Sequence, residues 1–236
     1  MNTVLIVLGV IFLVIVAVVA AGVVFAVTIR LRQNRQLDRQ AAEQQDYPEW
    51  AAEHDLTYDP EDPVLQNAGL GQVMPFRDFN GPGVLFRTNH VFHGEFVGRP
   101  GYLLGLALFA DPRPGAKPSA TYTVALARLD PPAPELALGQ GKRGKRRDAG
   151  SVRTGDAAFD ARFVVTAADQ RAALDLLQAP LMTWLSEQPR QGMPSMHLNG
   201  GWACCYLRGP FLIERAERVR DQLERLLASR DGQASA

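Results

Sequence analysis

Residues 84–110, which read VLFRTNHVFHGEFVGRPGYLLGLALFA, decide the fold. Both halves are rich in β-branched and aromatic residues, and Gly98-Arg99-Pro100-Gly101 lies between them. Runs of this kind separated by glycine and proline are typical of two strands joined by a tight turn. A third run, ATYTVALARLD at 120–130, follows the turn-forming residues 111–115. We therefore predict a meander of antiparallel strands.

A short helix is predicted on the N-terminal side of the meander. Asp46 is a suitable N-cap and Pro48 suits the first turn, so we expect WAAEHDL at 50–56 to be helical. The strand-like LTYD at 56–59 follows this helix.

After the meander, strands and helices are predicted to alternate. PPAPELAL at 131–138 is predicted as an edge strand, because proline cannot donate to a central ladder. MHLNGGWACCYL at 196–207 is predicted as a hairpin that turns at Asn199-Gly200-Gly201. The other expected elements are a strand at 159–165 and helices at about 167–177 and 181–187.

The last predicted element is an amphipathic helix at 211–230, FLIERAERVRDQLERLLASR. Its apolar residues recur at helical spacing and are expected to face the core: Leu212, Ala216, Val219, Leu223 and Leu226. On the solvent side, Glu214 with Arg218 and Asp221 with Arg225 are spaced for i,i+4 pairs. The end of the chain, RDGQASA at 230–236, is predicted to be disordered.

The first 29 residues predict a membrane anchor. Residues 4–29, VLIVLGVIFLVIVAVVAAGVVFAVTI, carry no charge and no proline. Roughly 20 apolar residues in a helix span a bilayer core, so this run is long enough to cross once. It is too long for the apolar core of a signal peptide, so we expect an uncleaved anchor.

Arginine follows this segment closely, at Arg30, Arg32, Arg35 and Arg39. Because Lys and Arg are enriched on cytoplasmic flanks, we expect the N-terminus outside and the soluble domain in the cytoplasm, at the plasma membrane. The expected organisation is an anchor at 1–29, a polar stalk at 30–46, a domain at 47–229 and a tail at 230–236.

Composition excludes a bulk attraction to nucleic acid, since 25 acidic residues balance 25 basic ones. The two cysteines, Cys204 and Cys205, are adjacent, which fits reduced thiols. In a strand they point to opposite faces, so we expect buried structural cysteines, one of them on the side of Trp202 and Tyr206.

A basic loop at 139–150 contains GQGKRGKR, which satisfies the spacing G-x-x-x-x-G-K. A phosphate-binding loop also needs Ser or Thr next and a helix after it, whereas Arg146 occupies that place. We therefore expect no nucleotide site. The basic residues of the loop are expected to be solvated, with contact to anionic lipid as the alternative: Lys142, Arg143, Lys145, Arg146 and Arg147.

Residues with catalytic chemistry are scattered. His90, His93 and Glu95 are close in sequence, but 90 and 93 point to opposite faces of a regular strand, so a shared metal would need a bulge. Asp160 is the fourth candidate for a hydrolase or transferase site. We expect ordinary structural roles for these residues, with no cofactor, no metal and no assigned catalytic residue.

The order of several segments resembles an uncharacterised bacterial family of membrane-anchored domains. These segments are FDARFVVTAADQ, ALDLLQAPLMTWLSE and MHLNGGWACCYL between 159 and 207, followed by Phe211. The W-A-x-x-x-x-L-x-Y pattern at 50–58 and G-x-F-x-G-R-P at 94–100 are similar to actinobacterial members. The resemblance implies an α+β domain tethered to the membrane and supplies no catalytic residues.

The sequence thus favours an α+β fold: one membrane helix, then a domain with an antiparallel meander, packed helices and a final amphipathic helix. The expected function is a non-enzymatic module at the cytoplasmic face that binds a protein partner or itself. The alternatives are a membrane-tethered hydrolase or transferase, and a module that binds anionic lipid.

Overall fold

The computed structural model describes residues 44, 46–61, 70, 73, 75–79, 85–111, 113, 116–141, 151–189 and 192–234. Apart from Gln44, they belong to one compact unit, Gln45–Ala236. The predicted anchor at 1–29, its four arginines and nearly all of the stalk lie outside the described residues. Within the described part, no helix is both long and apolar enough to cross a bilayer.

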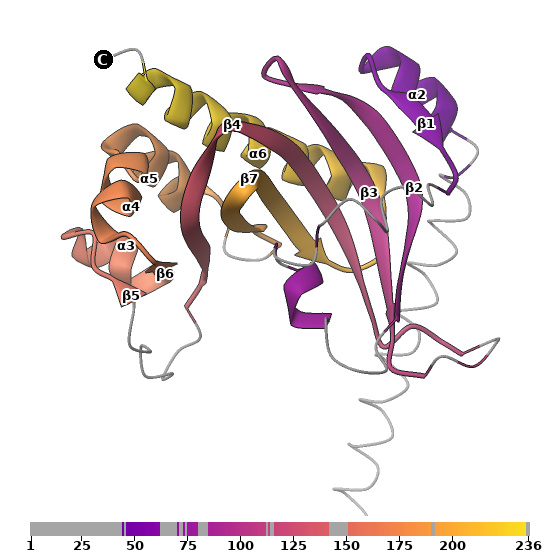
Figure 1. Ribbon diagram of the computed structural model, residues 1–236, viewed down its shortest axis with the longest axis horizontal. Helices are drawn as coiled ribbons and strands as arrows, with labels where there is room; N and C mark the ends of the chain where they lie inside the picture. Colours follow the sequence, from indigo (N-terminus) through magenta and orange to yellow (C-terminus); the bar gives the residue numbers. More distant parts are fainter. Residues whose placement is uncertain are drawn as a thin grey trace, which may run out of the picture. The chain divides into compact units, whose positions relative to one another are not determined.

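The predicted meander is confirmed by three long antiparallel strands (Figure 1): β2 (Leu85–Phe96), β3 (Arg99–Phe109) and β4 (Ala120–Gln140). The predicted strand LTYD is β1 (Thr57–Asp59), which pairs with β2. The β2–β3 turn consists of Val97 and Gly98, because Phe96 faces Arg99 across the ladder. The fold class is therefore α+β with an antiparallel sheet.

Three further strands complete the sheet: β5 (Ser151–Val152), β6 (Phe163–Ala167) and β7 (Ser195–Arg208). The strand order is β1-β2-β3-β4-β6-β5, and β7 also pairs with β4. β3 pairs with residues 120–127 of β4, and β6 pairs with residues 136–140. β7 pairs with residues in both of these stretches. β4 is therefore the strand that joins the two halves of the sheet.

The prediction of an edge strand at 131–138 is wrong. Leu136 and Leu138 pair with both β6 and β7, so this end of β4 is interior to the sheet. The strand tolerates its three prolines, Pro131, Pro132 and Pro134, because its pairing with β7 is irregular there. The β4–β7 register shifts between Arg128 and Ala133 and again between Ala133 and Leu136. The missing N–H groups fall where the ladder is already interrupted.

The prediction of a hairpin at 196–207 is also wrong, because β7 is one continuous strand along β4. Gly200 has φ +54°, the left-handed value expected of a turn glycine. It lies opposite Ala133, between the two register shifts. The glycine therefore serves a bulge in the strand and not a chain reversal.

The strand predicted at 159–165 begins four residues later. Residues Ala157–Arg162 form helix α3, and only Phe163–Ala167 forms β6. Asp156 caps this helix, since its Oδ1 accepts from the backbone N–H groups of Ala158 at 2.8 Å and Phe159 at 3.0 Å. The cap outweighs the β propensity of the aromatic residues.

The predicted helices are present as α2 (Tyr47–Glu53), α4 (Gln170–Leu176), α5 (Ala179–Glu187) and α6 (Ile213–Ala234). Helix α2 starts earlier than predicted, at the residue after Asp46. All five residues of the final helical region that were predicted to face the core are buried: Leu212, Ala216, Val219, Leu223 and Leu226.

Helix α6 is longer than the sequence predicted and includes residues 230–234 of the expected tail. Two side chains in this last part bind the sheet region. Arg230 donates to the Pro131 carbonyl oxygen, and Asp231 pairs with Arg99 at 2.5 Å. The predicted solvent-side pairs are confirmed as Glu214–Arg218 at 2.6 Å and Asp221–Arg225 at 3.1 Å.

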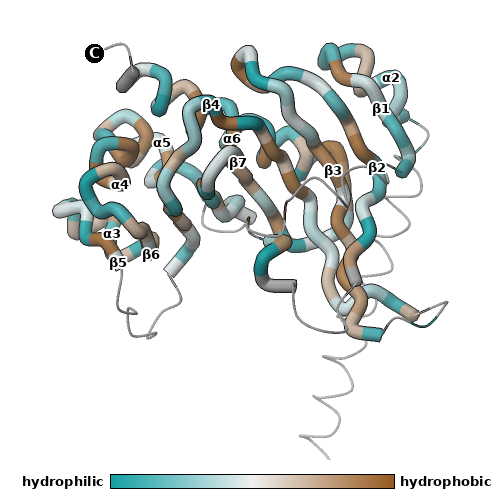
Figure 2. The backbone as a smooth tube through the Cα atoms, viewed as in Figure 1, coloured by the Kyte–Doolittle hydropathy of each residue, from teal (hydrophilic) through white to brown (hydrophobic). Residues whose placement is uncertain are grey.

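Both faces of the sheet carry buried apolar side chains. The helices pack with one face, on which Phe92, Leu103 and Cys205 lie, and α6 follows the sheet (Figure 1). The 3₁₀ helix η3 (Phe76–Phe79) packs with the other face through Phe76. Hydrophobic residues accordingly concentrate along the central strands, whereas hydrophobic and hydrophilic residues alternate along α6 (Figure 2).

Candidate functional site

A pocket lies where β4 leaves its neighbours. β3 pairs with β4 only as far as Ala127, and β6 begins to pair at Leu136. The segment between these points contains three prolines and a cis peptide bond between Asp130 and Pro131. The interrupted ladder leaves space between β4 and the neighbouring helix α4.

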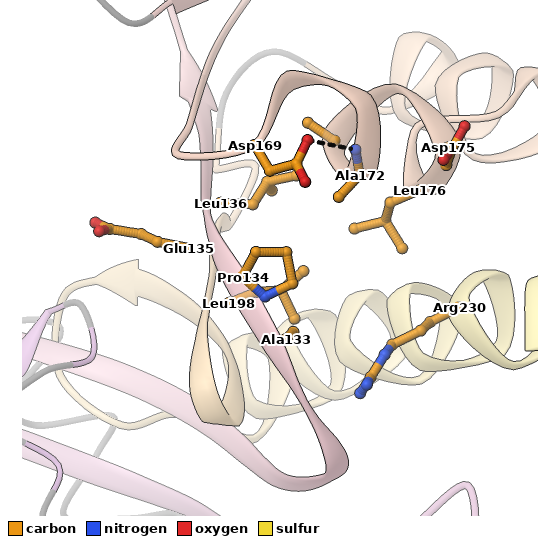
Figure 3. Close-up of a pocket in the computed structure, with 11 residues that line it drawn as sticks. Ala133, Pro134, Glu135, Leu136, Asp169, Ala172, Asp175, Leu176, Leu198 and Arg230 are labelled. Atoms are coloured by element: carbon orange, nitrogen blue, oxygen red, sulfur yellow. Dashed lines mark hydrogen bonds between the residues drawn. The ribbon is translucent and has the colours of Figure 1, made fainter.

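The pocket has a volume of about 210 Å³ and receives side chains from β4, β7, α4 and α6. Apolar residues form most of its lining: Ala133, Pro134, Leu136, Ala172, Ala173, Leu176 and Leu198. The other lining residues are charged: Glu135, Asp169, Asp175 and Arg230. Figure 3 shows the apolar side chains grouped between the charged ones. The hollow is therefore apolar inside and mainly acidic around it.

Asp169 is fixed at the rim because it is the N-cap of α4. Its Oδ1 accepts from the backbone N–H groups of Arg171 at 2.9 Å and Ala172 at 3.1 Å (Figure 3). Residues 168–171 are exposed, so its carboxylate lies at the surface. The first turn of α4 therefore holds this carboxylate in place at the rim of the pocket.

Arg230 and Arg99 hold the bulged part of β4 against α6. The guanidinium of Arg230 donates to the Pro131 carbonyl oxygen. Arg99 Nη1 donates to the Asp130 carbonyl oxygen at 3.4 Å. Burial lowers the pKa of Arg230, and the neighbouring Arg99 lowers it further. Arg230 thus directs its charge toward the backbone of β4 and not toward the apolar hollow.

Glu135 belongs to a separate group of charges, and its side chain points away from the other pocket residues (Figure 3). Its Oε1 accepts from Arg77 of η3, and the Nε2 of the fully buried His197 lies 3.6 Å from the same oxygen. The hydrogen bond from Arg77 is the main reason that the pKa of Glu135 is lowered. Glu135 therefore links β4, β7 and η3.

The histidines singled out by the sequence both contact β1. Tyr58 Oη lies 3.1 Å from His90 Nδ1, and Asp59 Oδ2 lies 3.1 Å from His93 Nε2. The bulge that a shared site would need is present, since the β2–β3 register shifts between Asn89 and Phe92 and His90 has φ +50°. Burial lowers the pKa of His90. The pairs tie β1 to β2.

The other two candidates are placed elsewhere. Glu95 is exposed and lies opposite Pro100 in the β2–β3 ladder. Asp160 lies within α3 and accepts from the backbone N–H of Thr154 at 3.2 Å and from the Thr154 hydroxyl at 3.3 Å. The structure therefore does not bring the four candidate residues into one catalytic arrangement. Within the described ranges, no group of three or more metal-ligating side chains is placed to hold a metal ion.

The cysteines lie as predicted, buried and on opposite faces of β7. Cys204 packs in the cluster that contains Trp202, whereas Cys205 packs on the helical side. Burial raises the pKa of both thiols, so both stay protonated at neutral pH. Both side chains pack in the apolar clusters of the core.

The basic residues assigned to membrane contact belong to two segments of the sequence. Arg30, Arg32, Arg35 and Arg39 of the flank, and the five basic residues of the loop at 142–147, lie outside the described residues. Their membrane contacts stay predictions.

Sequence reasoning missed the pocket residues, although two signals pointed to them. A-A-D-Q at 167–170 places an N-cap aspartate before a helix, and P-P-A-P at 131–134 marks a strand that cannot pair throughout. The position of Arg230 had no such signal, because it depends on the packing of α6 against β4.

Comparisons with known proteins bear on the fold alone. No protein-family model and no curated protein matches the chain. Its fold is similar to the crystal structure of the mycobacterial trehalose monomycolate transport factor A, TtfA, with a TM-score of 0.51 and 15% sequence identity. The match covers 78% of this chain and 94% of that one. An actinobacterial-type protein thus shares the fold.

Proposed function

We propose that this chain is a single-pass membrane protein whose α+β domain binds a protein partner at the cytoplasmic face without catalysing a reaction. The observation that carries the proposal is the apolar pocket beside the interrupted part of β4. A pocket with an apolar interior and charged surroundings suits recognition of a side chain. The likeness to a protein described as a transport factor is consistent with a non-enzymatic role.

The membrane part of the proposal is supported by the sequence. The uncharged run at 4–29 is followed by four arginines, which favours a cytoplasmic domain. Two reporters fused to the C-terminus, one active only outside the cytoplasm and one fluorescent only inside, test the orientation. Activity of the external reporter would overturn it.

A photo-crosslinking amino acid tests partner binding in the full-length protein in cells. It should replace Asp175 at the pocket in one variant and the exposed Lys117, before β4, in the matched control. We expect one discrete crosslinked protein from position 175 and none from 117. Recovery of only the uncrosslinked monomer from position 175 would contradict the proposed function.

A further inference from the structure

We propose that the pocket between β4 and α4 binds an apolar side chain of a partner polypeptide that carries lysine or arginine on both sides of it. This inference rests on the proposed function and adds the site and the chemistry of the partner. It is carried by the size of the hollow, the charges around it and the blocked backbone of β4.

The size of the hollow suits one side chain. Ligand pockets for whole cofactors or drug-sized molecules usually measure about 300–1,000 Å³, whereas this pocket measures about 210 Å³. An apolar cavity of about 150 Å³ can accommodate a benzene ring. A leucine or phenylalanine side chain therefore fits the volume, and Leu136, Leu176 and Leu198 supply apolar contacts for it.

The charges around the hollow favour a basic partner. Asp169 and Asp175 come from the N-cap and the last turn of α4, whereas Glu135 of β4 points away from the hollow and accepts from Arg77. Arg230 is the basic residue among those that line the pocket, and its guanidinium donates to the Pro131 carbonyl oxygen. A lysine or arginine next to the inserted side chain would meet the carboxylates of α4, whereas an acidic residue there would be repelled.

The backbone of β4 favours side-chain insertion over the addition of a strand. Pro131, Pro132 and Pro134 have no N–H to donate. The carbonyl oxygens of Asp130 and Pro131 accept from arginines, and that of Glu135 accepts from Ala168 N–H at 3.0 Å. An extended peptide would therefore find few ladder partners here, and recognition depends on the hollow and its rim.

The test uses the full-length chain in nanodiscs of neutral phosphatidylcholine, so that a basic peptide is not drawn to the lipid. The probe is a fluorescein-labelled Gly/Ser peptide with one leucine between two pairs of lysines. Two matched peptides replace the leucine by alanine or the lysines by glutamates. Fluorescence anisotropy gives the Kd, and we expect only the leucine–lysine peptide to bind measurably.

Two variants locate the binding. Asp169→Asn combined with Asp175→Asn removes two charges while Asn still caps α4, and we expect the Kd to rise about three- to tenfold. Asp156→Asn is the matched control, because Asp156 caps α3 in the same way. Ala172→Leu places a larger side chain into the hollow and should abolish binding with both carboxylates intact.

Equal binding of the leucine and alanine peptides would overturn the inference, as would an unchanged Kd in the Asn double variant or in Ala172→Leu. In cells, a partner crosslink that survives Ala172→Leu would overturn this site and leave the proposed function standing. Peptide binding that follows all the expected changes, without any cellular partner, would support the site and overturn the function.

Discussion

Replacing Val97 by asparagine is expected to stabilise the domain. Val97 and Gly98 form the two-residue turn between β2 and β3, with φ angles of +54° and +68°. Positive φ at both positions is the geometry of a type I′ turn, which favours Asn-Gly. A β-branched residue is strained at positive φ. Gly98 therefore matches the favoured Asn-Gly pair, and Val97 is the turn residue that departs from it.

The magnitude follows from two opposing effects. The left-handed conformation costs an ordinary L-residue about 1–2 kcal/mol, and asparagine tolerates it better than valine. Val97 is 45% exposed, so removing its methyl groups sacrifices only part of the roughly 1.5–3 kcal/mol that full burial would supply. We expect a net gain of about 0.5–1 kcal/mol, which would raise the Tm by about 1–4 °C.

Thermal unfolding of the full-length chain in detergent, followed by tryptophan fluorescence, measures this change. Gly98→Ala is the control variant, which should lower the stability of the domain instead of raising it. A Cβ on Gly98 would have no atom within 4 Å, so its cost is purely conformational and should lower the Tm. A Val97→Asn variant that is no more stable than the natural protein would refute the reasoning.

Three other substitutions test the packing and the titrating groups. Gly101→Ala should cost about 2–4 kcal/mol in urea unfolding, because its Cβ would overlap the Leu126 carbonyl oxygen; a loss below 1 kcal/mol would contradict this. Burial lowers the pKa of His90, so the unfolded state binds protons more readily and stability should fall as pH drops below about 6.5. His90→Asn, which tolerates φ +50°, should reduce that slope, and an unchanged slope would count against the assignment. Glu135→Gln should destabilise the protein at pH 7 by removing the ionised partner of Arg77. Because the folded pKa of Glu135 is lowered, the difference from the natural protein should shrink as pH falls below about 4, and a constant difference down to pH 3 would argue against the pair.

The sequence predicted the elements whose patterns are local. The β2–β4 meander follows from β-rich runs separated by turn residues, and the buried stripe of α6 follows from helical spacing. The prediction for 159–165 failed because it weighted propensity over capping. Asp156 was available as a signal, and its two bonds to the first turn of α3 decide that segment.

The failure at β7 has a different physical cause. Asn-Gly-Gly is a sound turn signal, but the φ +54° of Gly200 serves a bulge that matches a register shift in β4. Whether a left-handed glycine reverses the chain or only bends it depends on the partner strand. That information is not local, so residues 196–207 could not reveal it by themselves.

The same dependence explains why the candidate site was missed. The rule that prolines belong at sheet edges correctly indicated that residues 131–134 do not pair along both sides. The expectation of an edge strand came from treating the whole of 131–138 as one unit, whereas Leu136 and Leu138 pair on both sides just beyond the last proline.

A proline cluster followed at once by alternating leucines therefore indicates a gap inside a sheet. At such a gap a helix cap such as Asp169 can approach the strand, and the space between them becomes a pocket. The departure from regular pairing and the candidate binding site therefore lie at the same place in the sheet, where no local pattern marks the neighbouring helix.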